Sequence, residues 1–170
     1  NTHANSITLM PFAYGRFKTS NLKFNNLPWQ WWGESYKGTE ESIVLAKAEG
    51  LQVMVKPQIW FDHGKFTGHF ELDSEEEWVK FEDSYYEFIM QFAHLSEKHN
   101  LHLLCIGTEL SSFILARESF WKKLIKDIRK VYSGKLVYAA NWDSYKEIPL
   151  WDDLDYIGVD AYFPICHDQT

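Results

Sequence analysis

The sequence has little of what marks several large classes of protein. Its 170 residues include only two cysteines, too few for a disulfide scaffold. No apolar run approaches the roughly 18 residues of a membrane span. The 17 Lys and Arg against 24 Asp and Glu give a net charge of −7, without the basic stripe that nucleic acid binding requires. Neither G-x-G-x-x-G nor G-x-x-x-x-G-K occurs, which argues against a nucleotide-binding fold.

Metal and cofactor binding find no support in the sequence either. Cys105 and Cys166 lack the spacing of a zinc site, and both are expected to be simple thiols. His63 and His69 are too isolated to indicate a metal site, so exposed loop histidines are the better interpretation. What the sequence does have is aromatic residues, at 17% of the chain, which fill cores and also stack on the flat faces of sugars.

Predicted strands and helices alternate along the chain. Five apolar or alternating runs predict strands, over 5–12, 51–58, 101–108, 135–141 and 155–162. Thr39 is expected to cap a helix over 40–49, and the capping box from Ser74 to Glu77 is expected to begin the longest helix. Further helices are expected over 120–132 and 148–153. This order predicts an α/β fold built on a parallel sheet.

The run from His102 to Leu110 is the most informative part of the chain. A short apolar strand there ends in a single carboxylate, Glu109. Burying an ionised carboxylate is costly unless the protein uses or pairs it. In barrels of parallel strands, catalytic groups sit at the C-terminal strand ends. Glu109 is therefore a candidate catalytic acid.

Side-chain alternation along the strands extends this site. It places Glu109 on the same face as Gly107 and Cys105, toward a barrel interior. The same alternation turns toward that interior the residues that end the other strands: Lys56, Gln58, Trp60, Asn141, Asp160 and Tyr162. A polar cup rimmed by aromatic rings is the layout of an enzyme site on a barrel. For Lys56 and Asp160, a purely structural buried pair is an equally good interpretation.

Four segments, in order, carry a resemblance to a known family. They are Val53-Met-Val-Lys-Pro57 with Trp60, Cys105-Ile-Gly-Thr-Glu-Leu110, Tyr138-Ala-Ala-Asn-Trp-Asp143 and Trp151-Asp-Asp-Leu-Asp-Tyr-Ile-Gly-Val-Asp-Ala-Tyr-Phe-Pro164. Together they resemble glycoside hydrolase family 113, whose members are β-mannan-cleaving (β/α)₈ TIM barrels that retain the anomeric configuration. The resemblance implies a retaining glycosidase fold for nearly all of the chain.

The resemblance also implies roles for single residues. Glu109, closing the fourth barrel strand, would be the general acid/base. Asn141 and Tyr162 would hydrogen-bond a sugar hydroxyl or orient the nucleophile. Lys56 and Asp160 would shape the charge around it, and Trp60 would be a stacking platform for a sugar ring.

By the same resemblance, residues 1–170 form a single partial TIM-barrel domain of about five parallel strands. The chain would begin at the second barrel strand and stop after the sixth. The nucleophile of the family is a Glu ending the seventh strand, so this segment alone is expected to be inactive. The missing strands or a neighbouring chain are expected to cover the two open sheet edges.

Two alternatives stay open at this point. The cluster Trp29-Gln-Trp-Trp32 lines a distal sugar subsite or is only a patch on the side of the barrel. The expected partner is an oligo- or polysaccharide, and the leading function is hydrolysis of a β-linked, mannose-containing glycan. A non-catalytic carbohydrate-binding protein on a degenerate barrel is the alternative function.

Overall fold

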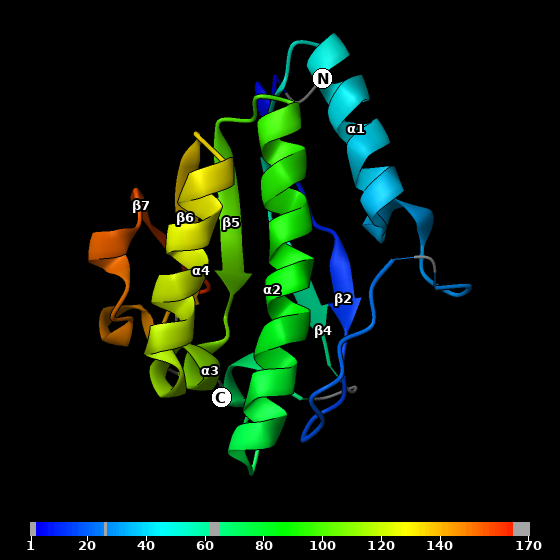
Figure 1. Ribbon diagram of the computed structural model, residues 1–170. Coiled ribbons are helices and arrows are strands. Elements are labelled where there is room, and N and C mark those ends of the chain that lie inside the picture. The colour runs from blue at the N-terminus through cyan, green and yellow to red at the C-terminus, as the bar shows by residue number, and fades with distance from the viewer. Residues whose placement is uncertain (1–2, 26, 62–64, 165–170) are drawn as a thin grey trace, which may run out of the picture.

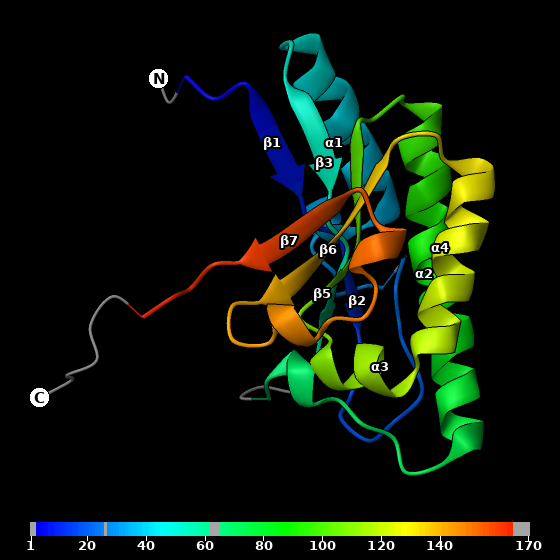
Figure 2. The ribbon, with the colours of Figure 1, turned by 90° about the vertical axis from the view of Figure 1, so that its left-hand side faces the viewer.

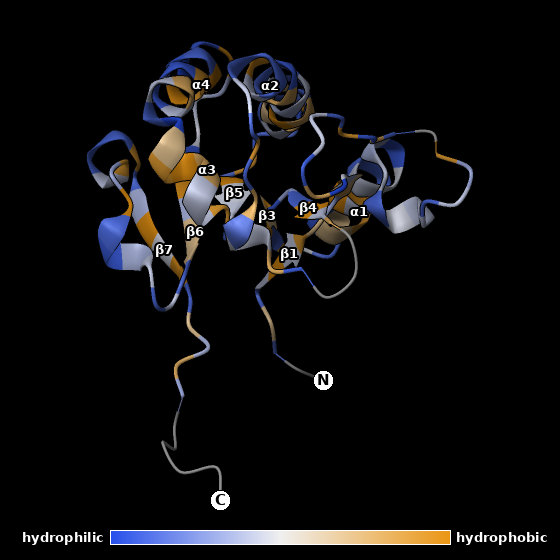
Figure 3. Ribbon diagram, turned by 90° about the horizontal axis from the view of Figure 1, so that it is seen from below, coloured by the Kyte–Doolittle hydropathy of each residue, from blue (hydrophilic) through white to orange (hydrophobic). Residues whose placement is uncertain are grey.

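The computed structural model describes residues 3–25, 27–61 and 65–164, and its centre is a parallel sheet. Five strands make up this sheet, in the spatial order β1 (Ser6–Leu9), β3 (Gln52–Val55), β5 (Leu103–Thr108), β6 (Lys135–Asn141) and β7 (Tyr156–Asp160). Figure 1 shows β5, β6 and β7, and Figure 3 labels all five strands in this order. Every neighbouring pair runs in parallel. The predicted α/β fold with five parallel strands is therefore confirmed.

Prolines interrupt the first two predicted strands. Pro11 separates β1 from β2 (Phe12–Tyr14), and Pro57 separates β3 from β4 (Gln58–Trp60). A proline has no N–H to donate to a ladder, so the pairing breaks there. β2 and β4 then pair in parallel as a second, two-stranded sheet beyond the C-terminal ends of β1 and β3.

Helices cover one face of the sheet. Those that do are α1 (Tyr36–Ala48), α2 (Glu75–Lys98) and α4 (Glu118–Val131), and Figure 2 shows α2 and α4 to the right of the strands. The short helix α3 (Ser111–Ala116) lies below the strands in that view. Ser74 caps α2 as predicted, because its hydroxyl accepts a hydrogen bond from the Glu77 N–H at 3.3 Å. α3 was not expected from the sequence, and the predicted helix over 148–153 is a single 3₁₀ turn at Trp151–Asp153.

The predicted start of α1 is wrong. The helix begins at Tyr36, and the hydroxyl of Ser35, not Thr39, accepts the capping hydrogen bond from the Gly38 N–H at 3.1 Å. Position 38, inside the first turn, suits only a glycine, because a Cβ there would lie 1.9 Å from the Trp32 carbonyl oxygen. Thr39 is already helical, and its hydroxyl donates back to the Ser35 carbonyl at 2.8 Å. A glycine therefore lies within the first turn of the helix, although the low helix propensity of glycine predicts a position outside it.

The core lies between the helices and the sheet. The predicted apolar stripe of α2 is buried as expected, with these members: Trp78, Phe81, Tyr85, Phe88, Phe92 and Leu95. In Figure 3 the hydrophobic colour concentrates in the strands, whereas hydrophilic residues mark the outer sides of α2 and α4. A second, small apolar cluster of Cys105, Val137 and Ala139 lies apart from this core. It marks the sheet face that no helix covers.

β1 and β7 are the edges of the five-stranded sheet, and each pairs on one side only within the described residues. Ile157 on β7 is 64% exposed, although strand residues of this size are normally covered. Coverage of these edges by further strands stays a prediction. None of the helices in the described ranges has the length and apolar character that crossing a membrane takes.

Candidate active site

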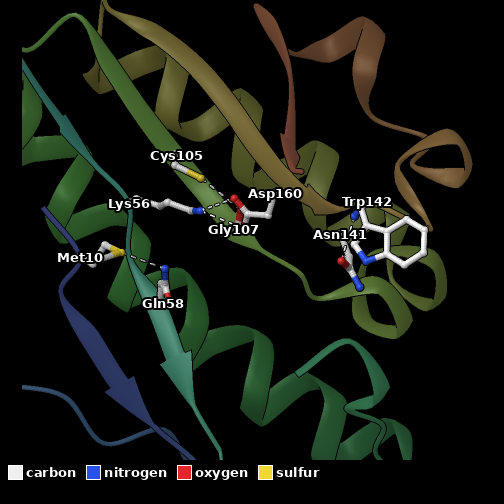
Figure 4. A network of polar contacts seen from close by, with 8 residues as sticks. All are labelled: Met10, Lys56, Gln58, Cys105, Gly107, Asn141, Trp142 and Asp160. Carbon is white, nitrogen blue, oxygen red and sulfur yellow. Dashed lines mark hydrogen bonds and ion pairs between the residues drawn. The ribbon is translucent and has the colours of Figure 1, made fainter. Parts of the chain in front are cut away.

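Side chains from the ends of four strands converge at one edge of the sheet. Lys56 follows β3, Glu109 follows β5, Asn141 ends β6 and Asp160 ends β7. Because the strands are parallel, their C-terminal ends meet at the same edge. Figure 4 shows Lys56 and Asp160 pointing toward one another, with Asn141 nearby on the neighbouring strand.

The ion pair between Lys56 and Asp160 shows that the sheet curves. The Lys56 Nζ lies 2.7 and 2.9 Å from the two carboxylate oxygens of Asp160. Both side chains are mostly buried, at 13% and 22% exposure. β3 and β7 are three strand spacings apart, or about 14 Å in a flat sheet. The two side chains meet because the sheet curls around its uncovered face, as in part of a barrel, and both residues face inward as predicted.

A β-bulge in β5 overturns one step of the predicted alternation. Cys105 pairs with Val137 and Thr108 with Ala139, so β5 advances three residues while β6 advances two. The extra residue reverses the alternation. Cys105 faces the interior cluster, but a Cβ on Gly107 would meet the Trp121 and Tyr138 rings on the helix side, at 2.7 and 2.9 Å. The prediction that Gly107 faces the site is therefore wrong.

Glu109 lies within electrostatic reach of Lys56 and Asp160, on the inner side of the sheet, and its backbone conformation is unusual. Its φ of 51° lies in the left-handed region, which non-glycine residues seldom adopt. Its N–H still donates to the Ala139 carbonyl at 2.8 Å, so the residue stays tied to β6. Strained backbone of this kind persists only where surrounding contacts impose it, and it concentrates at functional sites.

Two buried tyrosines hold this turn. The Tyr138 hydroxyl accepts a hydrogen bond from the Leu110 N–H at 2.7 Å. The Tyr85 hydroxyl donates to the Ile106 carbonyl at 2.8 Å, next to the bulge. These side chains supply hydrogen bonds where the regular ladder is broken. The position of Glu109 thus depends on Tyr85 from α2 and Tyr138 from β6. The sequence had indicated only a core position for Tyr85 and a place in a family motif for Tyr138.

We expect Tyr138→Phe to lower the free energy of unfolding of the full-length protein by about 1–3 kcal/mol, because the buried Leu110 N–H loses its acceptor. Urea unfolding measures this loss. Tyr132→Phe is the matched control, since the Tyr132 hydroxyl donates to the Leu101 carbonyl at 2.9 Å, far from the site. Both variants should lose stability, but only Tyr138→Phe should also lose activity. Equal activities would show that the turn does not position Glu109.

The surroundings of Glu109 favour the protonated acid. Burial raises the pKa of its carboxyl, and the negative charges of Asp160 and Asp143 raise it further. The positive charge of Lys56 acts against them by lowering this pKa. Within the described residues, the Glu109 carboxyl makes no hydrogen bond or ion pair. A partly buried carboxyl with a raised pKa suits a general acid.

The other predicted site residues differ in how far their side chains are exposed to solvent. The Asn141 Oδ1 accepts a hydrogen bond from the Trp142 N–H at 2.9 Å. Trp60, at the end of β4, is half exposed. Tyr162 lies two residues beyond β7 with 79% of its surface exposed, and its N–H donates to the Asp160 carbonyl at 3.0 Å. The roles of these three side chains stay predictions.

Sequence reading missed two neighbours of the site. Trp142 follows Asn141 directly, and its ring packs edge-on against Phe163 with centroids 6.0 Å apart (Figure 4 shows Trp142). Asp143 adds negative charge near Glu109. Their place in the segment after β6 was a usable signal, because loops at C-terminal strand ends line such sites. The side chain of Gln58 contacts Met10, and its Nε2 lies 3.3 Å from the Met10 sulfur.

A resident metal has no evident ligands here. Among residues 3–25, 27–61 and 65–164, no group of three or more His, Cys, Asp or Glu side chains could hold an ion. Cys105 is a buried free thiol, and its pKa is raised by burial. Cys166 and His63 lie outside the described residues.

A curved parallel sheet, helices on its outer face and an acidic group at the strand ends are the features of a TIM-barrel enzyme of the glycosidase class. The chain belongs to glycoside hydrolase family 113, because the model of that family matches residues 4–170. This confirms the predicted family resemblance. No curated protein matches the sequence.

Solved structures share the fold, among them the following three. The GH113 β-mannanase AaManA from Alicyclobacillus acidocaldarius, in complex with ManMIm, superposes with a TM-score of 0.85 at 24% identity, over 94% of this chain and 51% of that one. A GH113 β-1,4-mannanase gives a TM-score of 0.83 at 25% identity, with 96% and 53% covered. A complex of a GH113 β-1,4-mannanase gives 0.84 at 26%, with 98% and 54% covered. The chain thus spans about half the length of these barrels, which confirms the partial-barrel fold.

Proposed function

We propose that the full-length protein is a retaining glycoside hydrolase acting on β-mannan or manno-oligosaccharides, with Glu109 as its general acid/base. The observation that carries this proposal is the position of Glu109, at the C-terminal end of β5 with a raised pKa, in a chain of family 113. Solved family members named β-mannanases support the substrate class.

Retaining hydrolysis needs two carboxyl groups about 5–5.5 Å apart. In the first step the Glu109 carboxyl donates its proton to the glycosidic oxygen, while a carboxylate nucleophile attacks the anomeric carbon. In the second step the Glu109 carboxylate takes a proton from the water that releases the sugar. Asp160 is a poor nucleophile, because Lys56 occupies both of its oxygens. We therefore place the nucleophile on a barrel strand other than the five described, with residues 1–170 as one partial domain.

The remaining site residues have supporting roles in this proposal. Asn141 and Tyr162 hydrogen-bond sugar hydroxyls, and the half-exposed ring of Trp60 stacks on a sugar. Lys56 and Asp160 set the charge near Glu109 and hold β3 and β7 together. No step requires a metal or cofactor in this scheme.

Proton NMR of a manno-oligosaccharide digest tests the proposal. We expect the full-length protein to release a product whose first-formed anomer is β, because double displacement retains configuration. First formation of the α anomer would contradict the retaining mechanism. Binding of the oligosaccharide without any cleavage would favour the non-catalytic carbohydrate-binding alternative.

A further inference from the structure

A hollow lined in part by Trp60 adjoins the candidate active site. It has a volume of about 580 Å³ and lies at the C-terminal ends of β2 and β4. Aromatic and polar residues line it, among them Tyr14, Arg16, Asn21, Lys23, Trp29 and Trp60. Trp60 stands four residues beyond Lys56, so at most about 14 Å of extended backbone separates the two residues. A sugar chain that passes Glu109 can therefore reach the hollow.

Backbone hydrogen bonds and close packing hold the frame of the hollow together. The segment after β2 folds back, and Tyr14 and Lys23 exchange two backbone hydrogen bonds of 2.8 Å. The Gly15 N–H donates to the Trp60 carbonyl at 2.9 Å, which ties this segment to β4. A Cβ on Gly15 would lie 2.7 Å from the buried ring of Phe61, so the floor is closely packed. A preformed site avoids the cost of ordering these groups on binding.

Two kinds of group in the hollow point to one kind of ligand. The exposed rings of Trp29 and Trp60 offer flat apolar faces, and Trp29 packs edge-on against Tyr14 with centroids 4.5 Å apart. Such faces stack on sugar rings. Arg16 and Lys23 make no ion pair with any described residue, so their charges are available to an anion.

The local charge stands out against the whole chain. The protein has a net charge of −7, yet residues 1–33 contain Arg16, Lys18 and Lys23 and no Asp or Glu. The first acidic residue, Glu34, does not line the hollow, and the Tyr14 hydroxyl donates a hydrogen bond to its carboxylate. The charged side chains that line the hollow, Arg16 and Lys23, are both positive and attract a negatively charged group.

We propose that this hollow is an accessory subsite for a carboxylate-bearing sugar, a uronic acid residue on the glycan that the active site holds. The aromatic rings take the pyranose face, while Arg16 and Lys23 pair with the carboxylate. A guanidinium group matches a carboxylate through two parallel hydrogen bonds. The inference rests on the proposed function for its glycan backbone, and adds acidic substitution as a preferred feature of the substrate.

The test compares two ligands by isothermal titration with the full-length Glu109→Gln protein, which suppresses turnover. The ligands are a manno-oligosaccharide carrying one glucuronic acid branch and the same oligosaccharide without it. We expect the acidic ligand to bind about tenfold more tightly, the ratio that one net charge-assisted contact supplies. The double variant R16Q/K23Q should reduce this ratio to near one, and high salt should reduce it as well.

A matched control separates the hollow from general charge effects. Lys18→Gln with Lys37→Gln removes two positive charges from exposed side chains that do not line the hollow. This control should keep the preference for the acidic ligand. Equal binding of the two ligands by the unsubstituted hollow would overturn the proposal, as would equal losses in the two double variants. Continued hydrolysis by Glu109→Gln would instead count against the proposed catalytic role, and the affinity ratio would still report on the hollow.

Discussion

Glu109→Gln is expected to lower kcat on β-mannan by about 10²–10⁴-fold in the full-length protein, because the amide cannot donate a proton to the glycosidic oxygen. The effect should depend on the leaving group. With a dinitrophenyl β-mannoside as substrate, the dinitrophenolate leaving group departs without protonation. Formation of the glycosyl-enzyme from this substrate should therefore be nearly unaffected. Added azide should then release β-mannosyl azide, because this anion attacks the intermediate without base assistance. Steady-state kinetics with both substrates measures the two effects.

The control for this experiment is Glu147→Gln, the same chemical change at an exposed carboxylate on the segment between β6 and β7. It should leave kcat unchanged. Loss of activity on both substrates, without rescue by azide, would contradict an acid/base role for Glu109. Wild-type hydrolysis of mannan by Glu109→Gln would contradict any catalytic role.

Changes to the Lys56–Asp160 pair should move the pH dependence in opposite directions. A general acid must be protonated, so kcat/KM falls on the alkaline side as pH rises through the pKa of Glu109. Lys56 lowers this pKa and Asp160 raises it. Lys56→Met should therefore shift the alkaline limb to higher pH, and Asp160→Asn should shift it to lower pH. The pH profile of kcat/KM checks both directions.

Both variants also test what the ion pair contributes to stability. Each leaves a mostly buried charge without its partner, so we expect a loss of about 3 kcal/mol in the free energy of unfolding. Lys135→Met is the matched control, because the Lys135 Nζ lies 3.0 Å from an Asp155 oxygen. This ion pair is at the N-terminal ends of β6 and β7, whereas the site is at their C-terminal ends. That variant should leave the pH profile unchanged. Shifts of the same sign in Lys56→Met and Asp160→Asn would show that the pair does not act on Glu109 through its charges.

Much of the fold could be predicted because the signals are local. The five strands are continuous apolar or alternating runs, and the α2 stripe recurs at helical spacing around a Ser74 cap. The position of Glu109 at a strand end follows from the order of residues alone. The family resemblance added the barrel type and the expected role of Glu109.

Two of the errors have different physical causes. Thr39 was expected to cap α1, but the hydroxyl of Ser35, four residues earlier, accepts the capping hydrogen bond from the Gly38 N–H, so the helix starts at Tyr36. Strict alternation placed Gly107 toward the site, but one extra residue in β5 turns it toward Trp121. A bulge depends on pairing with the neighbouring strand, which no single run of residues records.

The amino-acid order by itself determined the sequence of strands and helices, the apolar faces and the carboxyl group at the end of the third predicted strand. Only the tertiary structure decided that Lys56 and Asp160 meet across the curved sheet, that two tyrosine hydroxyls hold the Glu109 turn, and that cations and tryptophans share one hollow. The physical reason is the distance along the chain over which each kind of interaction acts. Apolar periodicity and capping act over a few residues, whereas charge pairing and cavity shape join segments that are up to 104 positions apart along the chain.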